Sequence, residues 1–256
     1  MGRTIAIANQ KGGVGKTTTS VNLAAALAEG KCDVLLVDLD PQGNATSGVG
    51  IDKNTVPHTI YELILNTASF DEVLIKTEYD GLYVLPANIQ LSGAEIDLIG
   101  VDKREFLLRD ILEEQKGRFD FVLIDCPPSL NMLTVNAMTA ADTVLVPIQC
   151  EYYALEGLSQ LIHSVNLIKQ KLNPKLELEG VVFTMYDSRN RLSKEVVENV
   201  QQNLKENIYN TIIPRNVRLA EAPSYGMPII FYAPESTGAE AYRLLALEMV
   251  AHEMDE

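Results

Sequence analysis

The stretch Lys11-Gly12-Gly13-Val14-Gly15-Lys16-Thr17-Thr18 follows a short apolar run and precedes a segment rich in alanine and leucine. Its glycines allow backbone amides to converge on phosphate oxygens, and the helix expected after them directs its positive end at the same charge. We expect Lys16 to reach the β- and γ-phosphates of a nucleotide and Thr17 to offer its hydroxyl to magnesium. The stretch therefore predicts a phosphate-binding loop between a strand and a helix.

The loop departs from the usual spacing of such motifs. Gln10 stands where a phosphate loop ordinarily has its first glycine, and Lys11 is an additional lysine within the loop. Lys11 could neutralise the same phosphates or those held by a second copy of the chain, which would couple nucleotide binding to dimerisation. A glycine-rich turn with solvated lysines is the alternative, and the strand before it and the helix after it disfavour that interpretation.

Two aspartates follow apolar runs elsewhere in the chain. The run Asp33–Asp38 leads into Asp40, where Pro41 and Gly43 force a loop, and the run Phe121–Ile124 ends at Asp125. Either aspartate alone could be a helix cap or a solvated turn residue. Because the chain also carries the loop, we expect Asp40 to face the site and Asp125 to hold magnesium through water.

Short apolar runs alternate with amphipathic segments along the chain. Strands are expected at 4–8, 33–38, 82–86, 121–125, 143–148 and 178–184, and helices near 17–29, 103–116, 155–172, 194–206 and 239–252. Capping boxes are expected at Ser92 with Glu95 and at Thr237 with Glu240. The pattern predicts one domain over residues 1–256: an α/β fold with a doubly wound, mostly parallel sheet, helices on both faces and ligands beyond the carboxyl ends of the strands.

Five motifs together resemble the deviant Walker A ATPase family and, within it, the ParA/Soj chromosome-partitioning ATPases. The motifs span Lys11–Thr19, Val37–Thr46, Ile124–Ser129, Gln149–Gly157 and Ile213–Pro223. The resemblance covers nearly the whole chain. The last two motifs separate ParA/Soj from its relatives.

The resemblance implies a role for individual residues around ATP and Mg²⁺. Lys11 would contact nucleotide across an ATP-sandwich homodimer, and Lys16 would be the loop lysine. Asp40 would orient or activate the attacking water. The remaining implied contacts are the loop residues Gly12, Gly13, Val14 and Gly15, Thr17 on magnesium, Thr18 on the phosphate chain, Asp125 on magnesium through water, Pro214 and Asn216 near adenine, and Glu151 on ribose across the dimer.

Composition and resemblance disagree about DNA. A formal net charge of −14 should repel a polyanion, whereas residues 181–219 contain six basic and four acidic side chains. The resemblance implies that Arg189 and Arg218 contact DNA, with Arg191 and Lys194 as neighbours, through backbone phosphates and without sequence preference. Dimerisation would double this patch and make binding depend on ATP. The resemblance also implies a ParB-type centromere-binding partner that accelerates hydrolysis, and association with the nucleoid.

Three widely spaced cysteines favour a reducing cytoplasm over a disulfide framework. No apolar run approaches the length of a membrane span, and the acidic C-terminal segment lacks the basic face of a membrane-surface helix, so no membrane partner is expected. Two alternatives stay open. One is a membrane-cycling ATPase of the MinD type, and the other is a metabolic ATP-dependent synthetase on the same core.

Overall fold

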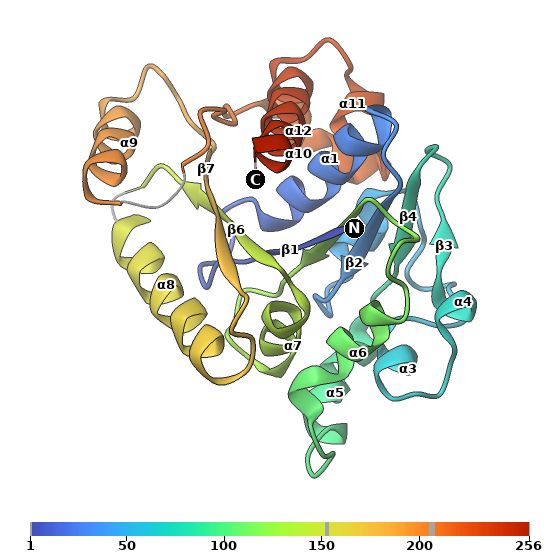
Figure 1. Ribbon diagram of the computed structural model, residues 1–256. Helices are drawn as coiled ribbons and strands as arrows, with labels where there is room; N and C mark the ends of the chain where they lie inside the picture. Colours follow the sequence, from blue (N-terminus) through green and yellow to red (C-terminus); the bar gives the residue numbers. More distant parts are fainter. Residues whose placement is uncertain (1, 152–153, 205–207, 256) are drawn as a thin grey trace.

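The computed structural model describes residues 2–151, 154–204 and 208–255, apart from the side chains of residues 253–255. Within these residues a seven-stranded sheet lies at the centre, in the order β3-β4-β2-β5-β1-β6-β7 (Figure 1). The strands are β1 (Arg3–Ile7), β2 (Val34–Asp38), β3 (Ile75–Lys76), β4 (Leu82–Leu85), β5 (Phe121–Asp125), β6 (Thr143–Gln149) and β7 (Glu177–Thr184). All neighbours pair in parallel except β3 with β4, which confirms the predicted mostly parallel sheet.

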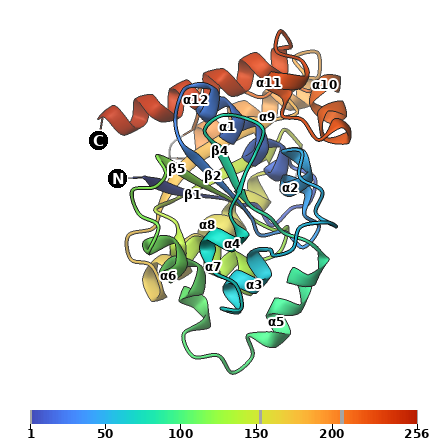
Figure 2. The same cartoon turned by 90° about the vertical axis from the view of Figure 1, so that its right-hand side faces the viewer.

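Helices cover both faces of the sheet (Figures 1 and 2). The longer helices are α1 (Lys16–Glu29), α6 (Leu107–Glu113), α7 (Met132–Ala140), α8 (Ala154–Lys171), α9 (Arg191–Asn203) and α12 (Thr237–Asp255). The shorter helices are α2 (Asn44–Gly48), α3 (Ile60–Ile64), α4 (Phe70–Val73), α5 (Ala94–Asp97), α10 (Val217–Glu221) and α11 (Ile229–Tyr232), with 3₁₀ turns η1 (Ile89–Gly93), η2 (Arg104–Phe106) and η3 (Ala222–Tyr225).

The side chains of β2 show why both faces need a cover. Val34 and Leu36 belong to one apolar core, with α1 and α12, whereas Leu35 and Val37 belong to a second core, with α6, α7 and α8. Successive side chains of a strand point to opposite faces, so an unbroken apolar strand must be buried on both. All five residues of β2 are buried, as that pattern requires.

Several elements differ from the sequence expectation. The sequence pattern does not predict α7 or β3, and between β2 and α6 it predicts a helix start only at Ser92. The helix expected at 103–116 is shorter, because Lys103 adopts a left-handed φ of 54° and only Leu107–Glu113 is α-helical. The helix expected at 194–206 ends at Asn203 as α9, and positions 205 and 206 lie outside the described residues.

Both expected capping boxes are wrong. Ser92 lies inside η1 and donates to the Ile89 carbonyl at 2.7 Å, while α5 begins after Gly93. Thr237 is the first residue of α12, and Ser236 Oγ accepts from Ala239 N at 3.2 Å instead. The capping pattern specifies the spacing of two residues and not where the helix starts. A helix that starts one residue away from the expected position therefore does not form the capping box.

Three strands bring their ends together at one edge of the sheet. Ile7 of β1 pairs with Asp125 of β5, and Asp125 also lies opposite Asp38 of β2. The loops that follow these strands therefore meet, at what we call the carboxyl edge. Within the described residues, no helix is both long enough and apolar enough to cross a membrane.

Candidate nucleotide site

The glycine-rich loop after β1 has the backbone that a phosphate cradle needs. Gly13 has a φ of 75° and Gly15, which precedes α1, has a φ of 90°, a conformation that side chains with a Cβ rarely adopt. Asn9 braces the loop, since its Oδ1 accepts from Lys11 N at 2.9 Å and its Nδ2 donates to Pro147 O at 2.8 Å. The first amides of α1 thus face the carboxyl edge, where an anion would be stabilised.

The two loop lysines have different surroundings. Lys16 is 7% exposed, and its Nζ donates to the Lys11 carbonyl at 3.0 Å. Burial lowers the pKa of Lys16, and the nearby carboxylates of Asp125 and Asp40 act in the opposite direction. Lys11 is half-exposed, and its Nζ forms an ion pair with Glu151 Oε2 of the same chain. The structure therefore brings Glu151, two residues after the end of β6, to Lys11.

Asp125 is buried at the end of β5 with one oxygen satisfied. Its Oδ1 accepts from Ser20 Oγ at 2.8 Å, whereas its Oδ2 is buried without a hydrogen-bond partner among the described residues. Burial raises the pKa of Asp125, and repulsion from Asp38 adds to that shift. A hydrogen bond from the Thr17 side chain to the Asp125 carboxylate works against the rise in its pKa. A buried carboxylate oxygen close to this hydroxyl suits a hard divalent cation, which takes oxygen ligands. The residues present therefore fit magnesium.

Asp38 positions the loop that carries Asp40. Asp38 Oδ1 accepts from Asp40 N at 3.1 Å, and its Oδ2 accepts from Thr46 N at 2.8 Å and Thr46 Oγ1 at 2.7 Å. Burial raises the pKa of Asp38, and the hydrogen bonds from Thr46 work against that rise. Gly43 has a φ of 60°, and a Cβ there would lie 2.5 Å from the Ala87 carbonyl, so this turn requires glycine.

A cavity of about 430 Å³ adjoins the phosphate loop. Gly15 and Thr18 line it on the loop side, and Pro214 and Asn216 line it on the other. Asn216 is fixed there because its Oδ1 accepts from Arg218 N and its Nδ2 donates to Thr237 Oγ1. The remaining lining includes Thr184, Met185, Ile213, Leu219 and Tyr242. The mostly apolar walls beside a phosphate cradle fit a purine base.

The arginines expected to contact DNA lie just outside this cavity. Arg189 follows β7 and Arg218 belongs to α10, and the two segments meet where Arg215 N donates to Tyr186 O at 2.9 Å. Each has a carboxylate partner, Asp187 for Arg189 at 2.9 Å and Glu221 for Arg218 at 2.8 Å. Both arginine side chains remain more than half exposed.

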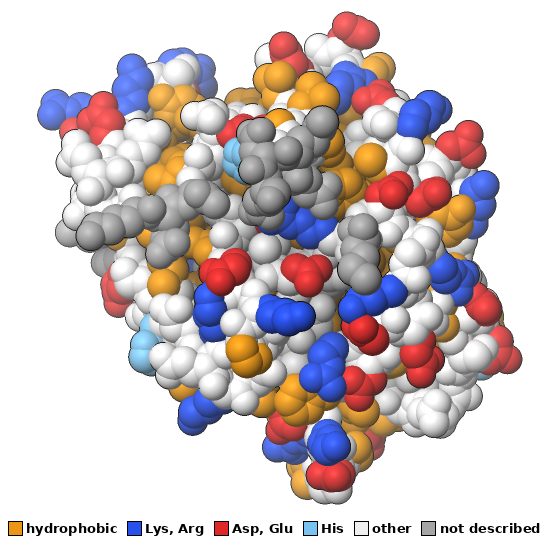
Figure 3. All heavy atoms as spheres, in the orientation of Figure 1, with side chains coloured by type: hydrophobic (Ala, Val, Ile, Leu, Met, Phe, Trp, Pro, Cys, Tyr) orange, Lys and Arg blue, Asp and Glu red, His pale blue; other side chains and the backbone are white. Residues whose placement is uncertain are grey.

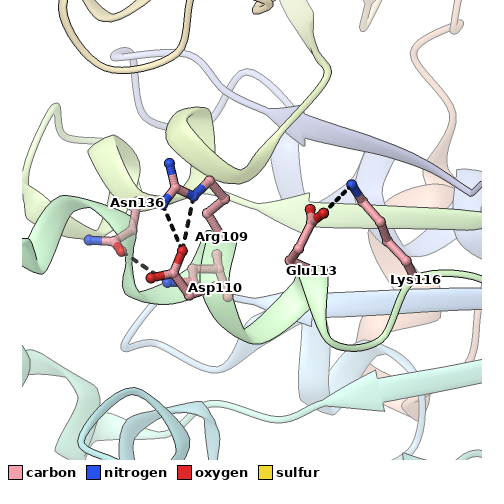
Figure 4. Close-up of polar contacts among 6 residues, drawn as sticks. Arg109, Asp110, Glu113, Lys116 and Asn136 are labelled. Carbon is pink, nitrogen blue, oxygen red and sulfur yellow. Dashed lines mark hydrogen bonds and ion pairs between the residues drawn. The ribbon is translucent and has the colours of Figure 1, made fainter.

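A larger hollow lies at the opposite, amino edge of the strands. Its volume is about 810 Å³, and Arg3, Arg109, Lys116 and Asp142 are among its lining residues. Figure 4 shows Arg109 directed at Asp110 and Lys116 at Glu113, pairs that approach to 2.8 and 2.6 Å. By size alone this hollow would be a better ligand site than the cavity at the carboxyl edge. Two of its cations, Arg109 and Lys116, are however already paired with carboxylates of α6.

Most of the site residues predicted from the sequence lie at the carboxyl edge, together with several supporting residues that were not predicted. Lys11, Lys16, Asp40 and Asp125 gather there, as do Thr17, Thr18, Pro214 and Asn216. The missed residues are Ser20, Asp38, Thr46, Thr184 and Tyr242. A polar residue at the end of an otherwise apolar strand was an available signal for Asp38. For Thr184 and Tyr242 the sequence carries no such signal, because only the folding of the chain brings them to the loop and to α1.

This loop, the two strand-end carboxylates and the adjoining cavity define a P-loop nucleotide hydrolase. Residues 2–178 match the family described as AAA domain. The chromosome partitioning protein ParA of Myxococcus xanthus is 54% identical over 250 residues, covering 98% of this chain and 88% of that protein. The chain belongs to the ParA/Soj family of chromosome-partitioning ATPases. Another relative, the sporulation initiation inhibitor protein Soj of Bacillus subtilis, is 54% identical over 98% of this chain and 100% of its own length.

Solved structures agree with the fold. A Mycobacterium smegmatis protein described as cobyrinic acid a,c-diamide synthase with bound ADP and magnesium has a TM-score of 0.88 and 40% identity, covering 99% of this chain and 96% of that one. The cell division ATPase MinD of Pyrococcus furiosus has a TM-score of 0.82 and 29% identity, covering 98% of this chain and 100% of that one.

Proposed function

We propose that the chain is an ATP-dependent DNA-partitioning switch, formed by residues 1–256 as one ATPase domain. The observation that carries this proposal is the placement of Lys11, Lys16, Asp40 and Asp125 at one sheet edge in a chain 54% identical to ParA and Soj proteins. The bound ADP and magnesium of the M. smegmatis relative support ATP and Mg²⁺ as the ligands here.

Each residue at the carboxyl edge has a proposed task. Lys16 and the amides from Gly12 to Thr18 hold the phosphates, and Thr17 and Asp125 hold magnesium, Asp125 through water. Asp40 orients the attacking water, and Asp38 positions Asp40 through the 3.1 Å hydrogen bond from its backbone. Magnesium, when bound, would neutralise charge that develops on the phosphates. Pro214 and Asn216 adjoin the adenine. Because the chain contributes position and charge, intrinsic hydrolysis is slow.

Dimerisation uses Lys11. In the structure Lys11 is ion-paired with Glu151 in its own chain, so it must leave that carboxylate to reach a nucleotide held by a second copy. The released Glu151 is then available to the ribose of the partner's nucleotide. Both groups are part-exposed, so the ion pair is weakly stabilising and its loss costs about 1 kcal/mol or less.

DNA binding follows dimerisation. Arg189 and Arg218 face solvent but share their charge with Asp187 and Glu221, which makes a single protomer a poor ligand for DNA. Two protomers present both arginines twice on one surface, and the avidity supplies what one copy lacks. The dimer binds duplex phosphates without sequence preference in the cytoplasm, on the nucleoid. A ParB-type partner accelerates hydrolysis, and the dimer then separates.

The test is duplex DNA binding by the purified chain with ADP or ATP, at low and moderate salt. We expect ATP to induce salt-sensitive binding that strengthens in Asp40→Ala and disappears in Arg218→Glu. Lys76→Glu is the matched control, because Lys76 lies on β3 and its reversal changes the net charge equally. Hydrolysis without DNA binding in any nucleotide state contradicts the proposal.

A metabolic synthetase is the second candidate, because the M. smegmatis relative is described as a cobyrinic acid a,c-diamide synthase. Such an enzyme consumes ATP only when its acceptor is present. ATP hydrolysis that rises with DNA and a ParB-type partner supports the switch, whereas hydrolysis that depends on a carboxylate-bearing acceptor supports the synthetase.

A further inference from the structure

The segment that joins β4 to α6 carries apolar side chains on its outer surface. Ile89 is 66% exposed, Ile96 72%, Ile99 69% and Val101 40%. The segment contains η1 and α5 and protrudes from the body of the molecule (Figures 1 and 2). We call these four residues the isoleucine patch. Exposed apolar side chains concentrated in one segment are typical of a surface that another molecule covers.

The fold holds this segment in place. Leu91, Ala94 and Leu98 are at most 1% exposed and pack into the core. Tyr61 of α3 donates its hydroxyl to Asp97 Oδ2 at 2.7 Å, and Asn88 Oδ1 accepts from Gln90 N at 3.0 Å. One side of the segment is therefore anchored while the other presents the isoleucine patch to solvent. The exposure follows from this anchored geometry.

The same segment is acidic. Between Ile89 and Asp102 there are three carboxylates, Glu95, Asp97 and Asp102, and no lysine, arginine or histidine. Lys103 and Arg104 follow, and Arg104 lies 3.7 Å from Glu105. Figure 3 shows apolar, acidic and basic side chains beside one another at the lower end of the molecule, where α5 lies in Figure 1. The three carboxylates of residues 89–102 favour a basic ligand over this part of the segment and repel a polyanion.

The charge of the segment also decides which kind of molecule could cover the isoleucine patch: a second copy of the chain, a membrane surface or another polypeptide. A symmetric contact between two copies brings a patch against itself, which would place the three carboxylates of one copy near those of the other. Anionic membrane surfaces attract helices rich in lysine and arginine, and this segment lacks both between 89 and 102. A polypeptide with apolar side chains and positive charge is complementary to both properties of the segment.

We propose that residues 89–102 dock a basic, apolar-containing polypeptide segment of a second protein. Its apolar side chains cover the isoleucine patch, and its lysines or arginines face Glu95, Asp97 and Asp102. The inference goes beyond the proposed partition switch and does not rest on it, because it uses none of the residues assigned to ATP or DNA.

The test uses a short fluorescein-labelled helical peptide with leucines on one face and lysines and arginines on the other. Fluorescence anisotropy measures its binding to the full chain at low and moderate salt. We expect Ile96→Ser with Ile99→Ser to weaken binding about tenfold or more, a loss of about 1.4 kcal/mol. We expect Glu95→Lys with Asp102→Lys to weaken it similarly and to reduce its salt dependence.

Matched controls separate the patch from general attraction to an acidic protein. Leu244→Ser with Leu247→Ser removes exposed leucines from α12, and Asp80→Lys with Glu114→Lys makes the same charge change elsewhere. Full binding in both controls supports the inference. Equal losses in controls and patch variants overturn it.

Two further readouts use the same patch variants. Loss of ATP-dependent dimerisation with unchanged peptide binding overturns the inference and makes the patch a contact between copies. Patch-dependent binding to vesicles of anionic lipid, with no peptide binding, overturns it in favour of a membrane. ATP hydrolysis by the patch variants should stay within twofold of the parent chain. The absence of ATP hydrolysis or DNA binding in the parent chain would count against the proposed switch and not against the docking of the peptide.

Discussion

The two edges of the sheet use the same kinds of charge in different ways. At the carboxyl edge, Lys16 and Asp125 are buried, and one oxygen of Asp125 has no hydrogen-bond partner among the described residues. At the amino edge, buried Glu179 accepts from Arg3, Thr143 and Tyr209 at 2.6 to 2.8 Å. The larger hollow is at the amino edge. A buried lysine and a buried carboxylate beside a phosphate-binding loop therefore mark the candidate site more reliably than empty volume does.

The largest expected effect comes from removing the loop lysine. Lys16→Gln should reduce the rate of ATP hydrolysis about 1,000-fold, since the lysine is the charge aimed at the phosphates. Lys116→Gln makes the same change in the larger hollow at the amino edge and should leave the rate within twofold. A phosphate-release assay on both variants measures the contrast. Equal losses of hydrolysis in the two variants would contradict the assignment of the nucleotide site to the carboxyl edge.

A second prediction concerns the carboxylates after β2. Asp40→Ala should reduce hydrolysis about 100-fold while ATP binding persists, because Asp40 acts on the attacking water. Asp38→Asn should reduce it less, about tenfold, since the amide oxygen can still accept from Asp40 N while the amide nitrogen cannot accept from Thr46. Single-turnover hydrolysis with calorimetric ATP binding separates the two steps. A larger loss in Asp38→Asn would assign the direct role to Asp38.

At the amino edge the expected loss is stability. Glu179→Ala should lower the free energy of unfolding by about 3 kcal/mol, because it leaves the Arg3 guanidinium without its buried carboxylate. Denaturant unfolding measures the change, and hydrolysis per folded molecule should be unaffected. Exposed Glu177, on the same strand, provides the control as Glu177→Ala and should change stability by less than about 1 kcal/mol. A large loss of hydrolysis in folded Glu179→Ala would contradict the division of roles.

The smallest effect depends on pH and lies away from the nucleotide. Burial raises the pKa of Glu248, but hydrogen bonds from Asn210 and Thr211 outweigh it and hold the pKa below its usual range. A lowered folded pKa adds stability above the unfolded value of about 4.3, and that stability is lost as the pH falls through the folded pKa.

Glu248→Gln should therefore cost less than about 1 kcal/mol at pH 7, with a difference from the parent chain that narrows below about pH 4.3. Denaturant unfolding across this pH range measures it. Glu240→Gln, exposed on the same helix, is the control. A difference that widens as the pH falls would show that Glu248 is not held as a carboxylate.

Local patterns determined much of this protein. Unbroken apolar runs predict strands buried on both faces, and the glycines around Lys16 and the strand-end positions of Asp40 and Asp125 predict a nucleotide site. These inferences succeed because the residues involved are close in sequence or constrained by backbone conformation. Start positions failed at Ser92 and Thr237, because spacing alone does not decide where a helix begins.

The tertiary structure alone decided which distant residues meet. Glu151 reaches Lys11, Ser20 reaches Asp125, and Tyr242 reaches the cavity beside the loop through the order of the strands and the packing of α12 on α1. It also decided that Arg189 and Arg218 share their charge with carboxylates, and that Ile96 and Ile99 face outward while Leu98 is buried. Contacts between residues far apart in sequence depend on sheet order and helix packing, which one sequence does not encode as a local pattern.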